Sequence, residues 1–114
     1  MSGISKLTLN IEENSASLHI SPEIYKRVLQ KAVLQTAQDI KALEEALPVG
    51  DFEKVKAISH KFKGDYDNLR LKDMSSVAKE MSDCAKTSQD KEKIAHLLET
   101  FSAYFDQLKE QMDK

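Results

Sequence analysis

Residues 51–69 read DFEKVKAISHKFKGDYDNL, and this stretch decides the fold. Apolar side chains recur along it every three or four residues, which is the spacing of one face of an α-helix. Asp51 stands just before the first of them and is a residue type that caps helices. The stretch therefore predicts an amphipathic helix with one buried face. The members of the apolar stripe are Phe52, Val55, Ile58, Phe62, Tyr66 and Leu69.

His60 lies outside the apolar stripe of this helix. At about 100° of rotation per residue, its side chain falls well over a third of a turn from the centre of the stripe. Ala57 and Gly64 lie one turn before and one turn after it. A glycine inside a helix costs up to about 1 kcal/mol relative to alanine, and close approach of another surface is a common reason for it. We therefore predict an exposed imidazole with little side-chain bulk on either side.

Two lysines are placed to reach a group carried on the His60 ring. Lys63 follows the histidine within one turn, and Lys56 precedes it by about one turn. An ammonium there would neutralise a phosphoryl group, and a neutral imidazole is a good nucleophile near pH 7. Composition alone favours an ordinary exposed histidine, whereas the small neighbours and the lysines favour a phosphoryl acceptor.

Three further amphipathic segments accompany this helix. The Ser-Pro-Glu sequence at 21–23 is typical of a helix start, and the Pro-Val-Gly sequence at 48–50 ends that segment. Between them we expect either one long helix or a short helix followed by a longer one. Two more helices are predicted around 74–85 and 94–112. The apolar positions behind these predictions are Ile24, Val28, Val33, Ile40, Leu43, Leu47, Met74, Val77, Ala78, Met81, Ala85, Ile94, Leu97, Leu98, Phe101, Phe105, Leu108 and Met112.

These elements predict an all-α protein: an antiparallel up-and-down four-helix bundle with a short N-terminal arm or an extra helix. The alternating patterns at 7–11 and 18–20 favour extended structure, although there is too little of it for a sheet. We accordingly divide the chain into an N-terminal arm, residues 1–20, and a bundle, residues 21–114. The arm is expected to pack on the bundle or to stay partly mobile.

Composition narrows the function classes. The chain has 114 residues, 40% of them hydrophobic and 32% charged, which suits one globular domain. Its net charge of −2 offers no basic excess for nucleic acid. There is no apolar run of about 18 residues for a membrane span, and no basic start followed by an apolar block. With Cys84 as the single cysteine, we expect a cytoplasmic protein.

No catalytic or metal-binding constellation is expected. The conceivable soft ligands do not form an i, i+4 pair or a close cysteine–histidine spacing, so we predict no metal site and no cofactor. There is no glycine-rich phosphate loop. Cys84 is expected to be a buried structural thiol, and the aromatic residues of the last helix are expected to be core. The ligands considered are His19, His60, His96 and Cys84.

The sequence HKFKG at 60–64 resembles the His-x-Leu-Lys-Gly signature of histidine phosphotransfer (HPt) domains. The flanks ALEEAL at 42–47, GDF at 50–52 and the Asn-Leu pair at 68–69 are similar too, and the resemblance runs from about Ser21 to the C-terminus. It implies a bacterial-type phosphocarrier of two-component signalling, without kinase activity of its own. By this resemblance, His60 would be the phosphorylation site and Lys63 the phosphate-stabilising residue. Gly64 would leave the gap in which a partner docks.

HPt domains carry phosphoryl groups between the receiver domain of a hybrid histidine kinase and the receiver of a response regulator. The resemblance thus implies receiver domains as partners, with docking at Lys56, Ala57, Gly64 and Asp67, Mg²⁺ in the receiver only, and a monomer. Two other hypotheses stay open. One is a degenerate HPt-like module that binds receivers without being phosphorylated. The other is a structural bundle that oligomerises through its apolar faces or its arm.

The sequence departs from the family pattern directly after the glycine. Residues 65–67 are Asp-Tyr-Asp where small residues are usual, and Arg70 follows the Asn-Leu pair where glycine is common. Helix geometry places Asp67 beside His60 and one turn beyond Lys63. Its carboxylate is expected to repel a phosphoryl group, to pair with the lysine, or to hydrogen-bond to the imidazole.

Overall fold

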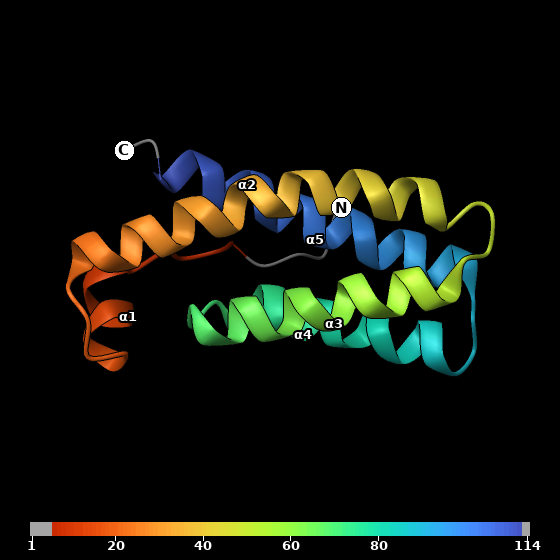
Figure 1. Cartoon of the computed structure of the whole chain (residues 1–114), viewed down its shortest axis with the longest axis horizontal. Helices are drawn as coiled ribbons and strands as arrows, with labels where there is room; N and C mark the ends of the chain where they lie inside the picture. The colour runs from red at the N-terminus through yellow and green to blue at the C-terminus, as the bar shows by residue number, and fades with distance from the viewer. Residues whose placement is uncertain (1–5, 113–114) are drawn as a thin grey trace.

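The computed structural model describes residues 6–112, and every regular element in that range is a helix (Figure 1). Helices α2 to α5 lie along the long axis of the molecule, and each of the last three runs back along the helix before it. Helix α3 packs against both α2 and α4, and α4 packs against α5. The all-α prediction is confirmed. The helices are α1 (Ile11–Ser17), α2 (Pro22–Ala46), α3 (Phe52–Asn68), α4 (Lys72–Lys86) and α5 (Lys91–Met112).

Side-chain caps determine where α2 and α3 begin. The Ser21 Oγ accepts the backbone N–H of Ile24 at 3.1 Å, and the Asp51 Oδ1 accepts that of Lys54 at 3.2 Å. Each contact satisfies a backbone donor that the first helical turn leaves unpaired. Gly50, in the turn between the two helices, has a φ of 73°, a left-handed conformation that favours glycine. Both predicted helix starts are confirmed, and α2 is one long helix rather than two.

An aromatic cluster holds α3 in the core. The Phe62 ring stacks on that of Phe101 with centroids 4.6 Å apart, and Tyr66 meets Phe101 edge-on at 5.9 Å. The Tyr66 hydroxyl is buried as well and shares a 2.7 Å hydrogen bond with the Thr36 Oγ1 of α2. Burial raises the pKa of Tyr66 to about 12, because the phenolate would lose its solvation.

The first half of α2 buries a different face from the predicted one. Tyr25 and Leu29 are buried, whereas Ile24 and Val28 are each 48% exposed. The Tyr25 hydroxyl donates to the backbone carbonyl of Leu69 at 2.5 Å. This hydrogen bond to the residue after α3 stabilises Tyr25 in the interior. The prediction of Ile24 and Val28 as core residues is wrong, because α3 ends at Asn68 and leaves that side of α2 without a covering helix.

Residues 7–9 of the N-terminal arm lie along α5. The backbone N–H of Leu7 donates to the Gln107 Oε1 at 2.7 Å. One turn further on, Gln111 uses both ends of its amide. Its Nε2 donates to the Leu7 carbonyl at 2.6 Å, and its Oε1 accepts the Leu9 N–H at 2.8 Å. Residues 1–5 of the predicted arm and residues 113–114 lie outside the described range.

The prediction of extended structure at 7–11 and 18–20 is wrong at residue 11 and at 18–20. Residues 11–17 are helix α1, and 18–20 form a turn in which His19 has a φ of 58°. Two local signals outweigh the alternation. The Asn10 Oδ1 caps α1 by accepting the Glu13 N–H at 3.0 Å, and two glutamates occupy the first helical turn. The extra helix that was the alternative to a plain arm is therefore present.

Candidate functional site

One face of α3 stays open to solvent. Glu53, Ala57, His60, Gly64 and Asn68 are all exposed and follow one another at the three- or four-residue spacing of a single helix face. The prediction that the imidazole faces away from the core is confirmed. The opposite face holds the buried residues Val55, Ser59, Phe62 and Tyr66.

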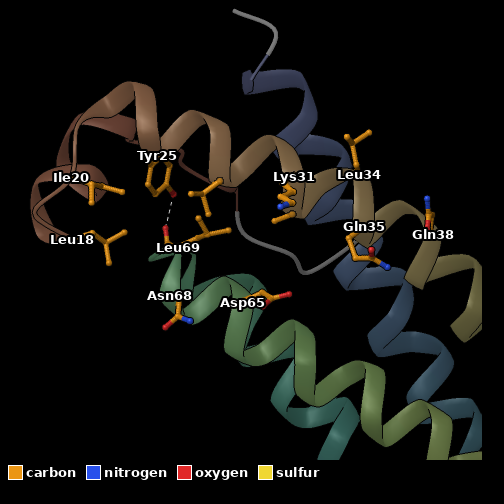
Figure 2. A pocket seen from close by; sticks show the side chains of 12 residues that line it. Leu18, Ile20, Tyr25, Lys31, Leu34, Gln35, Gln38, Asp65, Asn68 and Leu69 are labelled. Carbon is orange, nitrogen blue, oxygen red and sulfur yellow. Dashed lines mark hydrogen bonds between the residues drawn. The ribbon is translucent and has the colours of Figure 1, made fainter.

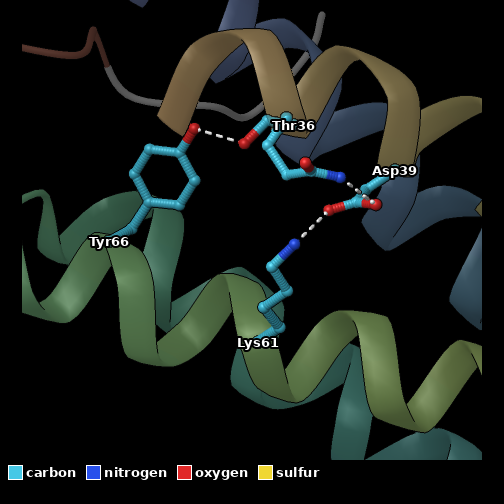
Figure 3. Close-up of polar contacts among 5 residues, drawn as sticks. Thr36, Asp39, Lys61 and Tyr66 are labelled. Carbon is cyan, nitrogen blue, oxygen red and sulfur yellow. Dashed lines mark hydrogen bonds and ion pairs between the residues drawn. The ribbon is translucent and has the colours of Figure 1, made fainter. Parts of the chain in front are cut away.

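Two contacts with α2 determine how α3 is rotated about its own axis (Figure 3). Tyr66 is hydrogen-bonded to Thr36, and the Lys61 Nζ lies 3.0 Å from the Asp39 Oδ2. The Tyr66 and Lys61 side chains of α3 thus point toward α2. His60 is the residue before Lys61, so its side chain is rotated by about 100° about the helix axis from that of Lys61 and faces solvent.

The lysines predicted to serve the imidazole both lie near carboxylates of α3. The Lys63 Nζ is 3.9 Å from the Asp67 Oδ2, and the two side chains are 40% and 51% exposed. The Ser75 hydroxyl of α4 donates to the Asp67 Oδ1 at 3.2 Å. The Lys56 Nζ lies 3.9 Å from the Glu53 Oε2. Of the three roles expected for Asp67, the structure shows pairing with the lysine.

Gly64 lies in the interior of α3, one turn after His60. A Cβ built at this position would meet nothing within 4 Å, and the backbone there is helical. Neither the backbone conformation nor internal packing therefore requires a glycine, although glycine costs about 1 kcal/mol in a helix. The bare backbone leaves open space beside the imidazole, available to the surface of another molecule.

A protein-family model described as the Hpt domain matches residues 27–113, which is most of the chain. The chain belongs to the Hpt domain family. Searches of the curated proteins and of the solved structures found no significant match. Membership in the Hpt family supports a phosphotransfer role in a phosphorelay, and the matched range includes all of α3 with its exposed histidine.

This Hpt domain has a groove of about 650 Å³ between the first half of α2, the turn before it and the C-terminal end of α3 (Figure 2). Val28 and Leu34, the latter 70% exposed, supply apolar lining. Asn68 lines the groove and also lies on the open face of α3, so the two surfaces are continuous. The sequence interpretation missed the groove. In the sequence, the groove is signalled by apolar residues of α2 that lie on a different face of the helix from the buried residues.

The other residues singled out in the sequence of this Hpt domain are core or surface residues. Cys84 is buried, as predicted for a structural thiol, and His96 is exposed on α5. Phe101, Tyr104 and Phe105 are buried in the core. Among residues 6–112, no three His, Cys, Asp or Glu side chains are grouped as a metal ion would need. No helix within that range has the length and apolar character to cross a membrane.

Proposed function

We propose that this Hpt domain is a phosphocarrier that accepts a phosphoryl group on His60 from the aspartate of one receiver domain and passes it to another. The observation that carries the proposal is the pairing of an exposed imidazole with a helical glycine that the protein's own packing does not need. On an isolated helix surface the histidine would be unremarkable. Beside open backbone, it can be reached by a second protein.

The chemistry asks little of the chain beyond presentation. A ring nitrogen lone pair of the neutral imidazole attacks phosphorus, a nitrogen–phosphorus bond forms, and the bond from phosphorus to the receiver's carboxylate oxygen breaks. The carboxylate leaves with the electron pair. Lys63, and Lys56 from the other side, supply positive charge for the phosphoryl oxygens. The proposal assigns Mg²⁺ to the receiver and no cofactor to this protein.

The open face of α3 and the groove beside it are proposed as the receiver docking surface. Ala57 and Gly64 keep side-chain bulk low around the imidazole, while Lys56 and Asp67 supply charge at its edges. The groove adds apolar area of the kind that protein interfaces bury at their centre. We further propose that the four long helices act as one bundle, and that the protein works as a cytoplasmic monomer without autonomous kinase activity.

Phosphotransfer from a labelled receiver tests the proposal. Receiver domains of the source organism, each phosphorylated on aspartate, are mixed with the wild-type protein, with His60→Gln and with His96→Gln. The last is a matched control, because His96 is also an exposed helical histidine. Wild type and His96→Gln should take up acid-labile, base-stable label, and His60→Gln should take up none.

Equal labelling of His60→Gln and wild type would show that the phosphoryl group goes elsewhere. A receiver that binds the wild-type protein but never transfers label would instead support the unphosphorylated docking module. Both outcomes overturn the phosphocarrier.

A further inference from the structure

Asp67 is the charged residue that most restricts the proposed phosphate-binding lysine. Its Oδ2 lies 3.9 Å from the Lys63 Nζ. Its Oδ1 lies 3.2 Å from the Ser75 hydroxyl of α4, which shares its one hydrogen between this carboxylate and the Lys72 carbonyl at 3.1 Å. Ser75 is buried, so it gives the carboxylate a fixed neighbour on a second helix. The carboxylate is therefore held on the side of α3 where the lysine can reach it.

The position of Lys63 along the helix places it between Asp67, which is anionic, and His60, which becomes an anionic partner only when it carries a phosphoryl group. Asp67 lies four residues after it, and His60 lies three residues before it, so each is one turn away in opposite directions. An ammonium that reaches toward Asp67 points away from the imidazole. A phosphoryl group on His60 must draw the Lys63 ammonium back toward the imidazole and break its ion pair with Asp67.

The ion pair is weak enough for this exchange to occur. Both side chains are about half exposed, and exposed helix pairs at this spacing change an equilibrium by about twofold. The lysine also precedes the acid, which is the less favourable order for such a pair. Asp67 therefore moderates the help that Lys63 gives without abolishing it.

We infer that Asp67 is a positioning residue that competes with the phosphoryl group for Lys63 and so keeps the phosphorylated form of this protein easily discharged. The inference rests on the proposed function, and it concerns how far transfer to His60 goes rather than whether it occurs. Asp67 also repels the phosphoryl group directly across about two helical turns, or roughly 10 Å. Both effects drive the phosphoryl group toward a receiver.

The test measures how label partitions at equilibrium between a receiver and this protein, for wild type and Asp67→Asn. The asparagine removes the charge with almost no change in shape. We expect a shift of about two- to fourfold toward the phosphorylated Hpt domain at low ionic strength. The shift should shrink below about twofold at high salt, because exposed charges this far apart are screened.

Asp83→Asn is the matched control. The Lys79 Nζ and the Asp83 Oδ2 form an ion pair at 2.9 Å with the same four-residue spacing on α4, and both side chains are exposed. This variant should partition label as wild type does. In a Lys63→Met background, Asp67→Asn should lose the part of its effect that depends on the lysine.

The outcomes separate the two proposals. If neither the wild type nor any variant takes up label, the proposed function fails. If wild type is labelled but Asp67→Asn partitions as Asp83→Asn does, the competition is refuted and the phosphocarrier stands. A shift that is the same at low and high salt would also refute the competition, because a purely structural effect would not depend on screening. Asp67→Ser provides the same comparison should the asparagine variant fail to fold.

Discussion

Replacing Gly64 with alanine should make the protein more stable and a poorer phosphate acceptor. Alanine is about 0.8–1.0 kcal/mol more favourable than glycine inside a helix. That gain should appear in full, because a Cβ at this position would meet nothing within 4 Å and the backbone is already helical. For a domain of this size, a gain of about 1 kcal/mol raises the midpoint of thermal unfolding by roughly 3–6 °C.

The same methyl group should slow transfer, because it fills space that we assign to the docked receiver. Urea unfolding and phosphotransfer rates are measured on the same preparations of wild type, Gly64→Ala and Gly64→Gln. Stability should exceed that of wild type in both variants, since both residues are better helix formers than glycine. Transfer should fall further with glutamine than with alanine. A loss of stability would refute our account of the backbone, and unchanged transfer in the glutamine variant would refute the docking role.

Three other predictions concern the fold. Arg70 has a φ of 64° just beyond the end of α3, a conformation that favours glycine, so Arg70→Gly should stabilise the protein by about 0.5–1 kcal/mol in urea unfolding. A loss of stability would mean that the 3.0 Å hydrogen bond from the Arg70 Nε to the Ser17 hydroxyl outweighs the relief of backbone strain. Because the pKa of Tyr66 is raised from 10.0 to about 12, the folded state holds its proton more tightly and stability should fall between about pH 10 and 12, by on the order of 2–3 kcal/mol. Tyr66→Phe should flatten that dependence, and an equally steep decline would assign it to other groups. Gln111→Ala should cost about 1 kcal/mol and speed amide exchange at Leu9, and unaltered exchange would contradict the contact with α5.

The sequence predicts α3 and its open face well, because every signal for them is local. Asp51 caps the helix, the apolar residues share one period, and the rotation of His60 away from them follows from helix geometry alone. Buried Phe62 and Tyr66 then agree with the pattern. The same reasoning correctly placed an exposed imidazole beside a bare backbone.

The failures depend on distant parts of the chain. Ile24 and Val28 match a helical repeat as well as Tyr25 does, and only the end of α3 at Asn68, with the carbonyl of Leu69 beyond it, decides which residue is buried. The groove follows from that same geometry.

The state of Asp67 was also beyond local reasoning. Spacing alone left open three roles for its carboxylate, of which pairing with Lys63 was one. Ser75 comes from α4, and its hydrogen bond to the carboxylate requires the packing of two helices.

The hold of α5 on the N-terminal segment has an evolutionary consequence. Gln107 and Gln111 bind main-chain amides and a carbonyl, groups that every non-proline residue possesses. Thr8 is exposed between the two bound residues and is free to vary, whereas Leu7 is buried and must stay apolar. We therefore expect related chains to differ widely in the sequence of this segment while the two glutamines stay the same. A conserved pair of glutamines on the last helix would then identify the segment even where its own sequence is no longer recognisable.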